Sequence, residues 1–270
     1  MKKLIFTIVM LIFVSVITLA QNDSLYIYRY GSIICRYPIS QIDSITFHKD
    51  SIYNTAMTTK LFNPYLNYGI MTDLNGNTYK TIKIGSQIWM AENLRTTKLS
   101  DGSDIPQITN SYEWAGLTTS ACCTYMNTQI NDSIITNGRL YNWFCVDGVV
   151  NIAPPGWHVP TDFEWETLRT QLGSLETGGG KLKETGFTHW ATPNEGANNH
   201  SGFTSIASGA RSNMGFFMGI HIEDVFWSSS QKYINYSDNG AYWYLSNNVA
   251  GFNNSYTNKQ FGFSVRLVKD

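Results

Sequence analysis

The sequence predicts an α+β protein with few helices, many short strands and long loops. Aromatic residues make up 14% of the 270 residues and charged residues also 14%, whereas a quarter of a typical domain is charged. Short alternating segments bounded by Gly, Asn and Pro recur along the chain, and one segment carries a full helix signature. This composition excludes a disordered chain, and a formal net charge of -1 gives no basic excess for binding nucleic acid.

Residues 1–20 predict a secretory signal peptide. Lys2 and Lys3 precede the apolar stretch 4–17, and small residues before Ala20 favour cleavage after it. A transmembrane anchor is the alternative, but the apolar stretch is short for a spanning helix. No cysteine follows this stretch to accept a bacterial lipid. We therefore expect a secreted or cell-surface protein whose mature chain has no membrane span.

Residues 21–66 predict a small N-terminal β hairpin unit followed by a linker. Two strand-like segments, 25–30 and 33–37, flank a Gly-Ser turn. A lone hairpin is barely stable, so this unit should dock on something else. Residues 48–66 lack periodicity and are predicted to be the linker.

The main domain is predicted to span residues 67–270 and to open with a hairpin. The segment 73–77 reads D-L-N-G-N and precedes the alternating segment 79–85. Its Asn-Gly pair favours a tight turn in which both central residues have positive φ. The acid and the two amides also resemble the start of a calcium loop, but the later acidic ligands are missing.

Residues 156–168 read G-W-H-V-P-T-D-F-E-W-E-T-L and predict the start of a helix. Thr161 is a good N-cap, and Glu164 stands at the position that completes a capping box. The predicted apolar stripe consists of Trp165, Leu168 and Leu172, and Gly173 can end the helix. The alternative is that His158 and the neighbouring acids form a catalytic cluster.

Three later segments, 226–230, 241–245 and 262–268, read as strands separated by polar loops. The run 178–180 of three glycines before a lysine suggests a phosphate loop at first sight. That interpretation fails because Lys181 is followed by leucine, whereas a phosphate loop requires Ser or Thr there.

Several motifs together resemble the Fibrobacter succinogenes major paralogous domain over residues 68–270. The motifs, in the order of the family, are D-L-N-G-N-T-Y-K-T-I-K-I-G, W-M-A-E-N-L-R-T-T, L-Y-N-W-F, G-W-H-V-P-T-D-F-E-W, G-G-K-L-K-E-T-G, F-W-S-S-S and G-F-S-V-R-L-V-K-D. The resemblance implies an exported bacterial protein, in a family whose biochemical function is poorly defined.

A more distant resemblance is to the C-type-lectin-like fold of the formylglycine-generating-enzyme type. It rests on P-T-D-F-E-W at 160–165 and G-F-S-V-R at 262–266. The resemblance implies an α+β fold of short strands, few helices and long loops. Many family members have cysteines where this chain has Ala153 and Leu267, and both are absent here together. If these cysteines form a disulfide in the relatives, their joint loss is coherent.

The 4 cysteines of the chain favour a disulfide, because export permits such bonds. They are Cys35, Cys122, Cys123 and Cys145, and the sequence leaves three pairings open. Adjacent Cys122 and Cys123 rarely bond to each other, so the favoured bridge joins one of them to Cys145. A metal site is not expected, since the chain has no C-x-x-C pair and no histidine at ligand spacing beside the cysteines.

The sequence predicts no catalytic residue and no cofactor. Formylglycine-generating enzymes use a late pair of cysteines, and none follows Cys145. No nucleophile motif is present. His221, Glu223 and Asp224 leave a metal site open, and paired acids for glycoside hydrolysis also remain open because their pairing is spatial.

The favoured function is binding of a glycan or protein ligand by the C-terminal part of the chain. Tyr and Trp give rigid contact faces, and Asn gives adaptable hydrogen bonds. The predicted binding residues are Trp227, Tyr242, Tyr244, Asn247, Asn248, Asn253 and Asn254. Alternation in 241–245 would place the two tyrosines on one face and Trp243 on the other, so half of the aromatics can be core. A structural spacer and a degenerate enzyme are the alternatives.

Overall fold

The computed structural model describes residues 24–29, 32–39, 61–234 and 237–270. The chain divides into two units, Met1–Thr55 and Ala56–Asp270, eleven residues before the boundary expected from the sequence. The expected signal peptide and most of the expected linker lie outside the described residues.

The N-terminal unit contains a β hairpin. Strand β1 (Ser24–Arg29) pairs antiparallel with β2 (Ser32–Pro38), as expected, with a register shift after Ile27. Cys35 belongs to β2, but its side chain lies outside what the structure describes.

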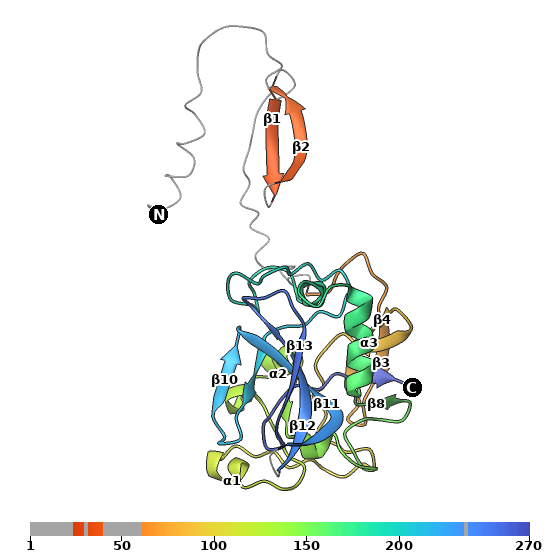
Figure 1. Cartoon of the computed structure of the whole chain (residues 1–270), viewed down its shortest axis with the longest axis vertical. Helices are drawn as coiled ribbons and strands as arrows, with labels where there is room; N and C mark the ends of the chain where they lie inside the picture. Colours follow the sequence, from red (N-terminus) through yellow and green to blue (C-terminus); the bar gives the residue numbers. More distant parts are fainter. Residues whose placement is uncertain (1–23, 30–31, 40–60, 235–236) are drawn as a thin grey trace. The chain divides into compact units, whose positions relative to one another are not determined.

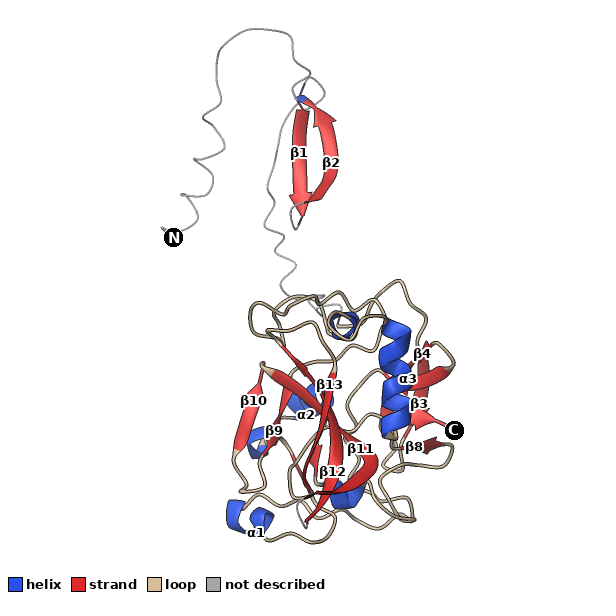
Figure 2. Cartoon of the chain, in the orientation of Figure 1, coloured by secondary structure: helices blue, strands red, loops and turns tan. Residues whose placement is uncertain are grey.

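The second unit is built mainly from two five-stranded sheets (Figures 1 and 2). The first has the order β3 (Gly69–Thr72), β4 (Thr78–Ile84), β5 (Gln87–Met90), β14 (Val268–Lys269), β8 (Trp157–His158). The second has the order β10 (Phe217–Ile220), β9 (Ser208–Arg211), β11 (Glu223–Ile234), β12 (Ser237–Ser246), β13 (Asn253–Asn258). A short pair joins β6 (Cys122–Cys123) to β7 (Leu140–Tyr141). The first sheet therefore unites the beginning and the end of this unit.

Helices are few and short in the described residues (Figure 2). The α-helices are α1 (Ser111–Ala115), α2 (Asn131–Asn137) and α3 (Asp162–Leu172), and the 3-10 turns are η3 (Tyr125–Asn127), η4 (Trp143–Cys145) and η5 (Gly178–Lys181). The prediction of an α+β protein of short strands, few helices and long loops is confirmed at this level. No helix in these ranges is both long and apolar enough to cross a bilayer.

The β3–β4 connection is a hairpin, but it differs from the expected tight turn. Only Gly76 of the Asn-Gly pair has a positive φ, 81°, and the loop closes between Asp73 N–H and the Asn77 carbonyl at 3.0 Å. The Asp73 carboxylate accepts hydrogen bonds from Asn75 N, Asn77 N, Asn77 Nδ2 and the Tyr79 hydroxyl, at 2.6–2.9 Å. Asp73, which would be the first ligand of a calcium loop, therefore stabilises the turn through these hydrogen bonds.

Helix α3 begins and ends as the sequence predicts. Thr161 Oγ1 accepts from Glu164 N–H at 3.3 Å, and Glu164 Oε2 accepts from Thr161 N–H at 2.9 Å, which completes the capping box. The helix ends at Gly173, whose φ is 102°. The buried stripe is the expected one, Trp165, Leu168 and Leu172.

Thr161→Ala should lower the free energy of unfolding by about 1 kcal/mol, because it leaves an N-terminal amide of the helix without its acceptor. Reversible chemical denaturation measures this loss. Thr167→Ala is the matched control, since its exposed hydroxyl only bonds back to the Phe163 carbonyl at 2.8 Å. Equal effects of the two substitutions would contradict the role of the capping box.

Tryptophan contributes the largest side chains of the core. Seven indoles are fully buried, namely Trp89, Trp114, Trp143, Trp165, Trp190, Trp227 and Trp243. Trp165 of α3 lies at the centre of one cluster, with ring centroids 4.5 Å from Trp89 and 5.5 Å from Phe226. The aromatic richness of the sequence is therefore largely explained by packing.

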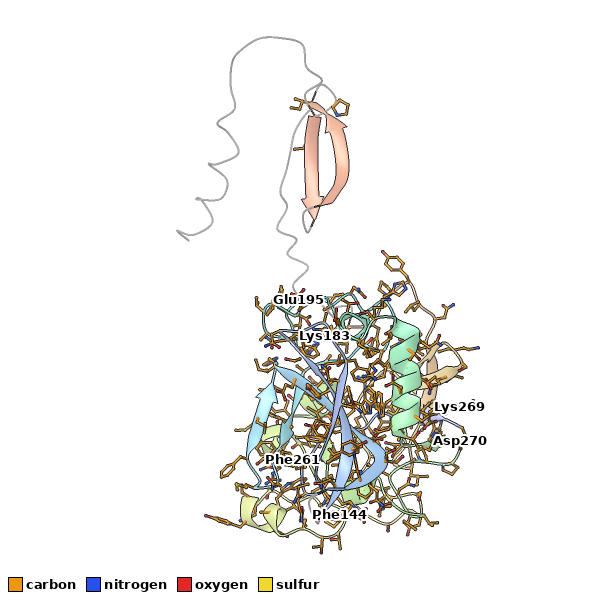
Figure 3. The ribbon with its side chains drawn as sticks, in the orientation of Figure 1. Phe144, Lys183, Glu195, Phe261, Lys269 and Asp270 are labelled. Atoms are coloured by element: carbon orange, nitrogen blue, oxygen red, sulfur yellow. The ribbon has the colours of Figure 1, made fainter. Side chains whose placement is uncertain are left out.

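The glycine-rich stretch before Lys181 packs into the main unit. Gly178, Gly179 and Gly180 are buried, and Lys183 beyond them is fully buried too. Lys183 Nζ donates to the carbonyls of Ser246 and Val249 at 2.9 and 3.0 Å. Burial lowers the pKa of Lys183 to about 8, although Glu195 at the same end of the unit opposes this (Figure 3). Packing thus replaces the phosphate binding that this stretch suggests.

Residues 61–66 belong to the main unit, so the linker prediction is wrong for them. Phe62 and Leu66 pack against the cluster around α3. The Asn63 amide donates to the Asn199 carbonyl at 3.0 Å. These contacts across a long sequence separation have no local pattern, which is why the segment looked like a linker.

Candidate functional site

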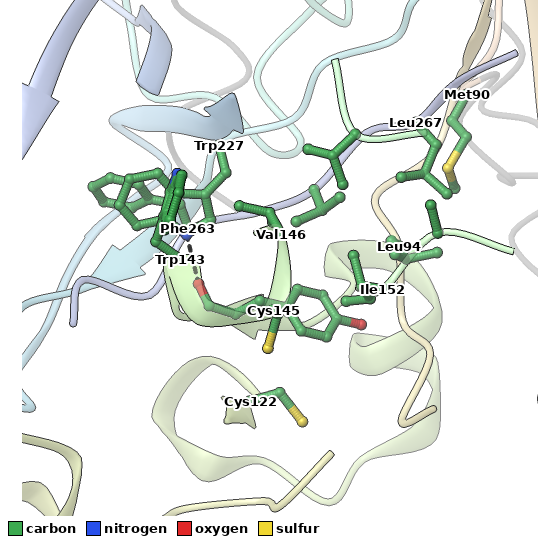
Figure 4. Close-up of a cluster of buried hydrophobic side chains, with 14 of the residues drawn as sticks. Met90, Leu94, Cys122, Trp143, Cys145, Val146, Ile152, Trp227, Phe263 and Leu267 are labelled. Atoms are coloured by element: carbon green, nitrogen blue, oxygen red, sulfur yellow. Dashed lines mark hydrogen bonds between the residues drawn. The ribbon is translucent and has the colours of Figure 1, made fainter. Parts of the chain in front are cut away.

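The aromatic residues expected to bind a ligand separate into core and surface positions. Trp227 is fully buried, with Nε1 donating to the Tyr141 carbonyl at 2.7 Å (Figure 4). Its burial contradicts the expected place on a binding surface. Tyr242 and Tyr244 share one face of β12 and are half-buried, whereas Trp243 lies on the other face against α3, as the alternation predicted.

The expected amide residues also separate. Asn247 is 8% exposed and donates to the Thr192 carbonyl at 3.0 Å, so it holds the loop that contains Thr192. Asn248, in contrast, is exposed. Asn253 pairs with Tyr244 and Asn254 with Trp243 across β12 and β13, so the two lie on opposite faces of the sheet. The predicted residues therefore do not form one site, although Asn253 shares its face with the two tyrosines.

The expected disulfide is not formed. Cys122, Cys123 and Cys145 are free and buried, and Cys122 and Cys145 belong to one hydrophobic cluster (Figure 4). Burial raises the pKa of Cys122 to about 12 and of Cys123 to about 11, and it raises that of Cys145 further. The Cys145 thiol instead lies 3.3 Å from the Ala121 carbonyl.

The metal alternative at His221, Glu223 and Asp224 does not agree with the geometry. Asp224 is fully buried and accepts from the hydroxyls of Ser205 and Ser208 at 2.6 and 2.7 Å. His221 instead faces the His189 carbonyl at 3.1 Å. In the part of the chain that the structure describes, no three His, Cys, Asp or Glu residues form a group that could hold a metal.

His158 lies between two carboxylates. Its Nε2 is 2.6 Å from Glu164 Oε1, and its Nδ1 is 2.6 Å from Asp270 Oδ1. Burial lowers the pKa of His158, but the hydrogen bonds and charges of Asp270 and Glu164 outweigh this and raise it above its ordinary value. The cluster ties the start of α3 to Asp270 beyond β14, and no hydroxyl or thiol among the described residues bonds to the imidazole.

The pH dependence of unfolding should reveal this pairing. Because the folded pKa of His158 is raised, its stabilisation is full below the unfolded value of about 6.5 and is lost as pH rises through the folded value. His158→Gln should therefore cost up to about 1 kcal/mol near pH 6, and less near pH 9, since the imidazole is 38% exposed. His200→Gln, at an exposed histidine, is the control. A pH-independent cost would contradict the ion pair.

Two grooves on the described surface differ in character. The larger, about 640 Å³, is mostly lined by residues 61–68 together with Lys80 and His189. The Lys80 ammonium lies 5.1 Å from the Phe62 ring centroid, and the Asn63 amide is already bonded. Its lining is rich in apolar side chains, namely Leu61, Phe62, Pro64 and Leu66.

The second groove, about 380 Å³, is polar, and we call it the Asn–Arg groove. Its lining residues are Asn75, Asn77, Arg95, Thr97, Asn131, Ile134, Ile135 and Arg139. They come from the β3–β4 turn, the segment after β5, helix α2 and the residue before β7. Four separate segments thus converge on one depression in the surface.

Hydrogen bonds hold the walls of the Asn–Arg groove. Asn75 Oδ1 accepts from Thr97 N–H at 2.8 Å and from the Thr96 hydroxyl at 2.6 Å, and Asn75 Nδ2 donates to Thr97 Oγ1 at 3.1 Å. Arg139 Nε donates to the Arg95 carbonyl at 3.1 Å. The turn, the segment after β5 and Arg139 are therefore linked to one another.

The two arginines and Asn131 keep unused hydrogen-bonding groups. Arg95 Nη2 donates to the Thr78 carbonyl at 2.8 Å, and Arg139 Nη1 donates to Gln107 Oε1 at 2.9 Å. Among the described residues, Arg95 Nε, Arg139 Nη2 and the exposed Asn131 amide have no hydrogen-bond partner. These groups are free for a ligand.

The sequence analysis missed this groove. Its signals were the D-L-N-G-N and E-N-L-R-T-T motifs, which carry Asn75, Asn77, Arg95 and Thr97. The first predicts a turn, with the start of a calcium loop as its alternative, and both serve as family motifs. Their proximity to Arg139 depends on the tertiary fold, which no local pattern reveals.

Comparison with known proteins gives one match. The model of the Fibrobacter succinogenes major domain matches residues 82–269, well over half of the chain. Searches of curated proteins and of solved structures gave no match. The match covers both five-stranded sheets apart from β3 and the start of β4, and includes Arg95 and Arg139 of the groove. The chain therefore belongs to the Fibrobacter succinogenes major domain family.

Proposed function

We propose that this protein is an exported, non-catalytic recognition module that binds a saccharide in the Asn–Arg groove. The observation that carries the proposal is the groove itself, where unpaired amide and guanidinium donors lie beside the apolar side chains of Ile134 and Ile135. Sites for small ligands combine apolar surface with a few fixed polar groups. A sugar ring presents both kinds of surface, with hydroxyls at its edge and C–H groups on its faces.

Rigid walls favour binding in this groove. Asn75 is held by three hydrogen bonds, and the Arg95 guanidinium lies 4.3 Å from the Tyr79 ring centroid. A preformed wall loses little conformational entropy when a ligand binds. Asn131, in contrast, is exposed, so its side chain can change rotamer to donate to the ligand.

The state of the cysteines supports recognition without catalysis. The three described cysteines are buried thiols with raised pKa values, so they are poor nucleophiles.

Export is supported by the signal-peptide pattern of residues 1–20, and we expect the exported chain to begin at Gln21. N-terminal sequencing that began at Met1 would contradict export.

We also propose that the main unit has the C-type-lectin-like fold of the formylglycine-generating-enzyme type. Support comes from the P-T-D-F-E-W and G-F-S-V-R motifs together with the mixture of short strands, few helices and long loops. An experimental structure whose strand connectivity differed from that fold would contradict it.

A glycan array with the mature chain tests the function. We expect at least one saccharide to bind, and Asn131→Ala to weaken that binding about tenfold, as loss of one or two ligand hydrogen bonds would. The melting temperature should stay unchanged because the Asn131 side chain has no partner among the described residues.

Asn248→Ala is the matched control, since Asn248 is an exposed amide that does not line the groove. Absence of binding to any saccharide would contradict the proposed function and favour a spacer. Binding that Asn131→Ala leaves unchanged and a Tyr244 variant abolishes would move the site to the face of β12.

A further inference from the structure

We infer that the Asn–Arg groove selects acidic saccharides, through an anionic group held between Arg95 and Arg139. This inference rests on the proposed function and adds the chemical class of its ligand. The anionic group is a carboxylate or a sulfate, which share the planar or near-planar pairs of oxygens that guanidinium groups bind.

The placement of the two arginines supports this selection. Both side chains line the groove, and the Arg139 guanidinium donates directly to the main-chain carbonyl of Arg95 at 3.1 Å. The Arg139 side chain therefore lies next to the main chain of Arg95, and the two arginines are neighbours rather than residues at opposite ends of the groove. Each arginine keeps a nitrogen without a partner in the described chain, so an anion could receive one donor from each.

Nearby acids balance only part of the positive charge of the two arginines. Glu92 forms an ion pair with Arg95, in which its Oε1 is 3.8 Å from Arg95 Nη1, whereas Arg139 has no carboxylate partner among the described residues. The other Glu92 oxygen accepts from Lys80 N–H at 2.5 Å. Asp73 is surrounded by four protein donors and is buried, and exposed Asp132 does not line the groove.

Hydrogen bonds within the protein use only some of the donors of the Arg95 and Arg139 guanidinium groups. Other buried arginines of this protein show the contrast: Arg211 donates from Nε, Nη1 and Nη2 to three main-chain carbonyls. Arg95 donates only from Nη2, to one carbonyl, and Arg139 donates only from Nε and Nη1. Two incompletely used guanidiniums beside unpaired amides fit an anionic, hydroxyl-rich ligand better than a neutral one.

The test compares two probes that differ in the charge of their carboxyl groups and otherwise only by a methyl group. An oligosaccharide of hexuronic acid units and its methyl ester are titrated against the mature chain by calorimetry, with a sulfated oligosaccharide as a third probe. We expect the acid to bind at least tenfold more tightly than the ester, and the preference to shrink between about 50 and 500 mM NaCl. Stronger binding of the sulfated probe would identify sulfate as the anionic group.

Arg139→Gln should reduce the acid-over-ester preference at least fivefold, whereas Lys83→Gln, which removes an exposed charge outside the groove, should leave it unchanged. Equal affinity for acid and ester would overturn the inference while leaving saccharide binding in place. No binding of these probes or of any array saccharide would contradict the proposed function itself. The probe comparison uses the unaltered protein, so it decides even if Arg139→Gln fails to fold.

Discussion

Arg266→Met is expected to lower the free energy of unfolding by about 4 kcal/mol or more, the largest loss expected of any single substitution considered for this protein. The guanidinium is fully buried and donates to four acceptors: Asn93 Oδ1 at 2.6 Å and the carbonyls of Met90, Phe203 and Thr204 at 2.7–3.1 Å. Methionine fills much of the same volume but donates nothing. The change therefore isolates the loss of hydrogen bonds from the loss of packing.

The magnitude follows from the four acceptors. A buried acceptor left without a donor costs about 1–3 kcal/mol, so the sum is about 4 kcal/mol or more. Native domains have only about 5–15 kcal/mol of stability in total. We expect either loss of soluble protein or a large fall in the urea midpoint. Lys83→Met, at an exposed cation on β4, is the control and should change the midpoint little. A shift of less than about 1 kcal/mol for Arg266→Met would contradict this role.

A second buried charge makes the expected loss larger. Burial raises the pKa of Asp224 to about 6, and the positive charge of Arg266 opposes this shift. Burial likewise lowers the pKa of Arg266 to about 10, and Asp224 opposes it. Without Arg266, the Asp224 carboxylate would lose its compensating charge and its pKa should rise further, so the variant should recover some stability as the pH falls below about 6.

Helix α3 shows what local sequence can predict. The N-cap, the capping-box acid, the apolar stripe and the terminal glycine are all within 13 residues of one another, and each acts on its neighbours. The hairpin of β1 and β2 is similarly local. Such elements depend on contacts within a few residues, so their residue types alone specify them.

The aromatic residues show where local sequence is insufficient. Alternation along β12 correctly placed Tyr242 and Tyr244 opposite Trp243, but it could not say which face meets solvent. Both faces of this strand are covered, one by α3 and the other by a cluster around Phe263. Trp227 of the neighbouring strand β11 is likewise core, although the sequence predicts it on a binding surface. Burial is set by elements far along the chain.

The Asn–Arg groove depends on tertiary structure to a still greater degree. Asn75 and Arg95 come from two motifs about twenty residues apart, and Asn131 and Arg139 follow much later. The sequence predicts Asn75 as a turn residue, with a calcium loop as the alternative, and not as part of a groove. A turn asparagine and a groove asparagine have the same local signature, so only the fold distinguishes them.

The glycine run at 178–180 has a packing role that its resemblance to a phosphate loop concealed. Gly179 lies against the main chain at Gly251, and Gly180 lies against the main chain at Gly196. Gly180 N–H donates to the Ala250 carbonyl at 3.0 Å, and its own carbonyl accepts from Asn198 N–H at 3.0 Å. Two loops are thus joined through η5 at backbone distance.

Gly180→Ala should accordingly lower the free energy of unfolding by about 3 kcal/mol or more. A methyl group at Gly180 would overlap the carbonyl oxygen of Gly196, and this neighbour is main chain that cannot rotate away as a side chain would. Gly116→Ala is the matched control, because the nearest atom to its added methyl is the Glu113 carbonyl oxygen at an ordinary 3.7 Å. Urea denaturation of both variants measures the difference. If the two midpoints agree, the close approach of η5 to Gly196 does not hold the loops together, and the buried Lys183 beside it would become the principal contact between them.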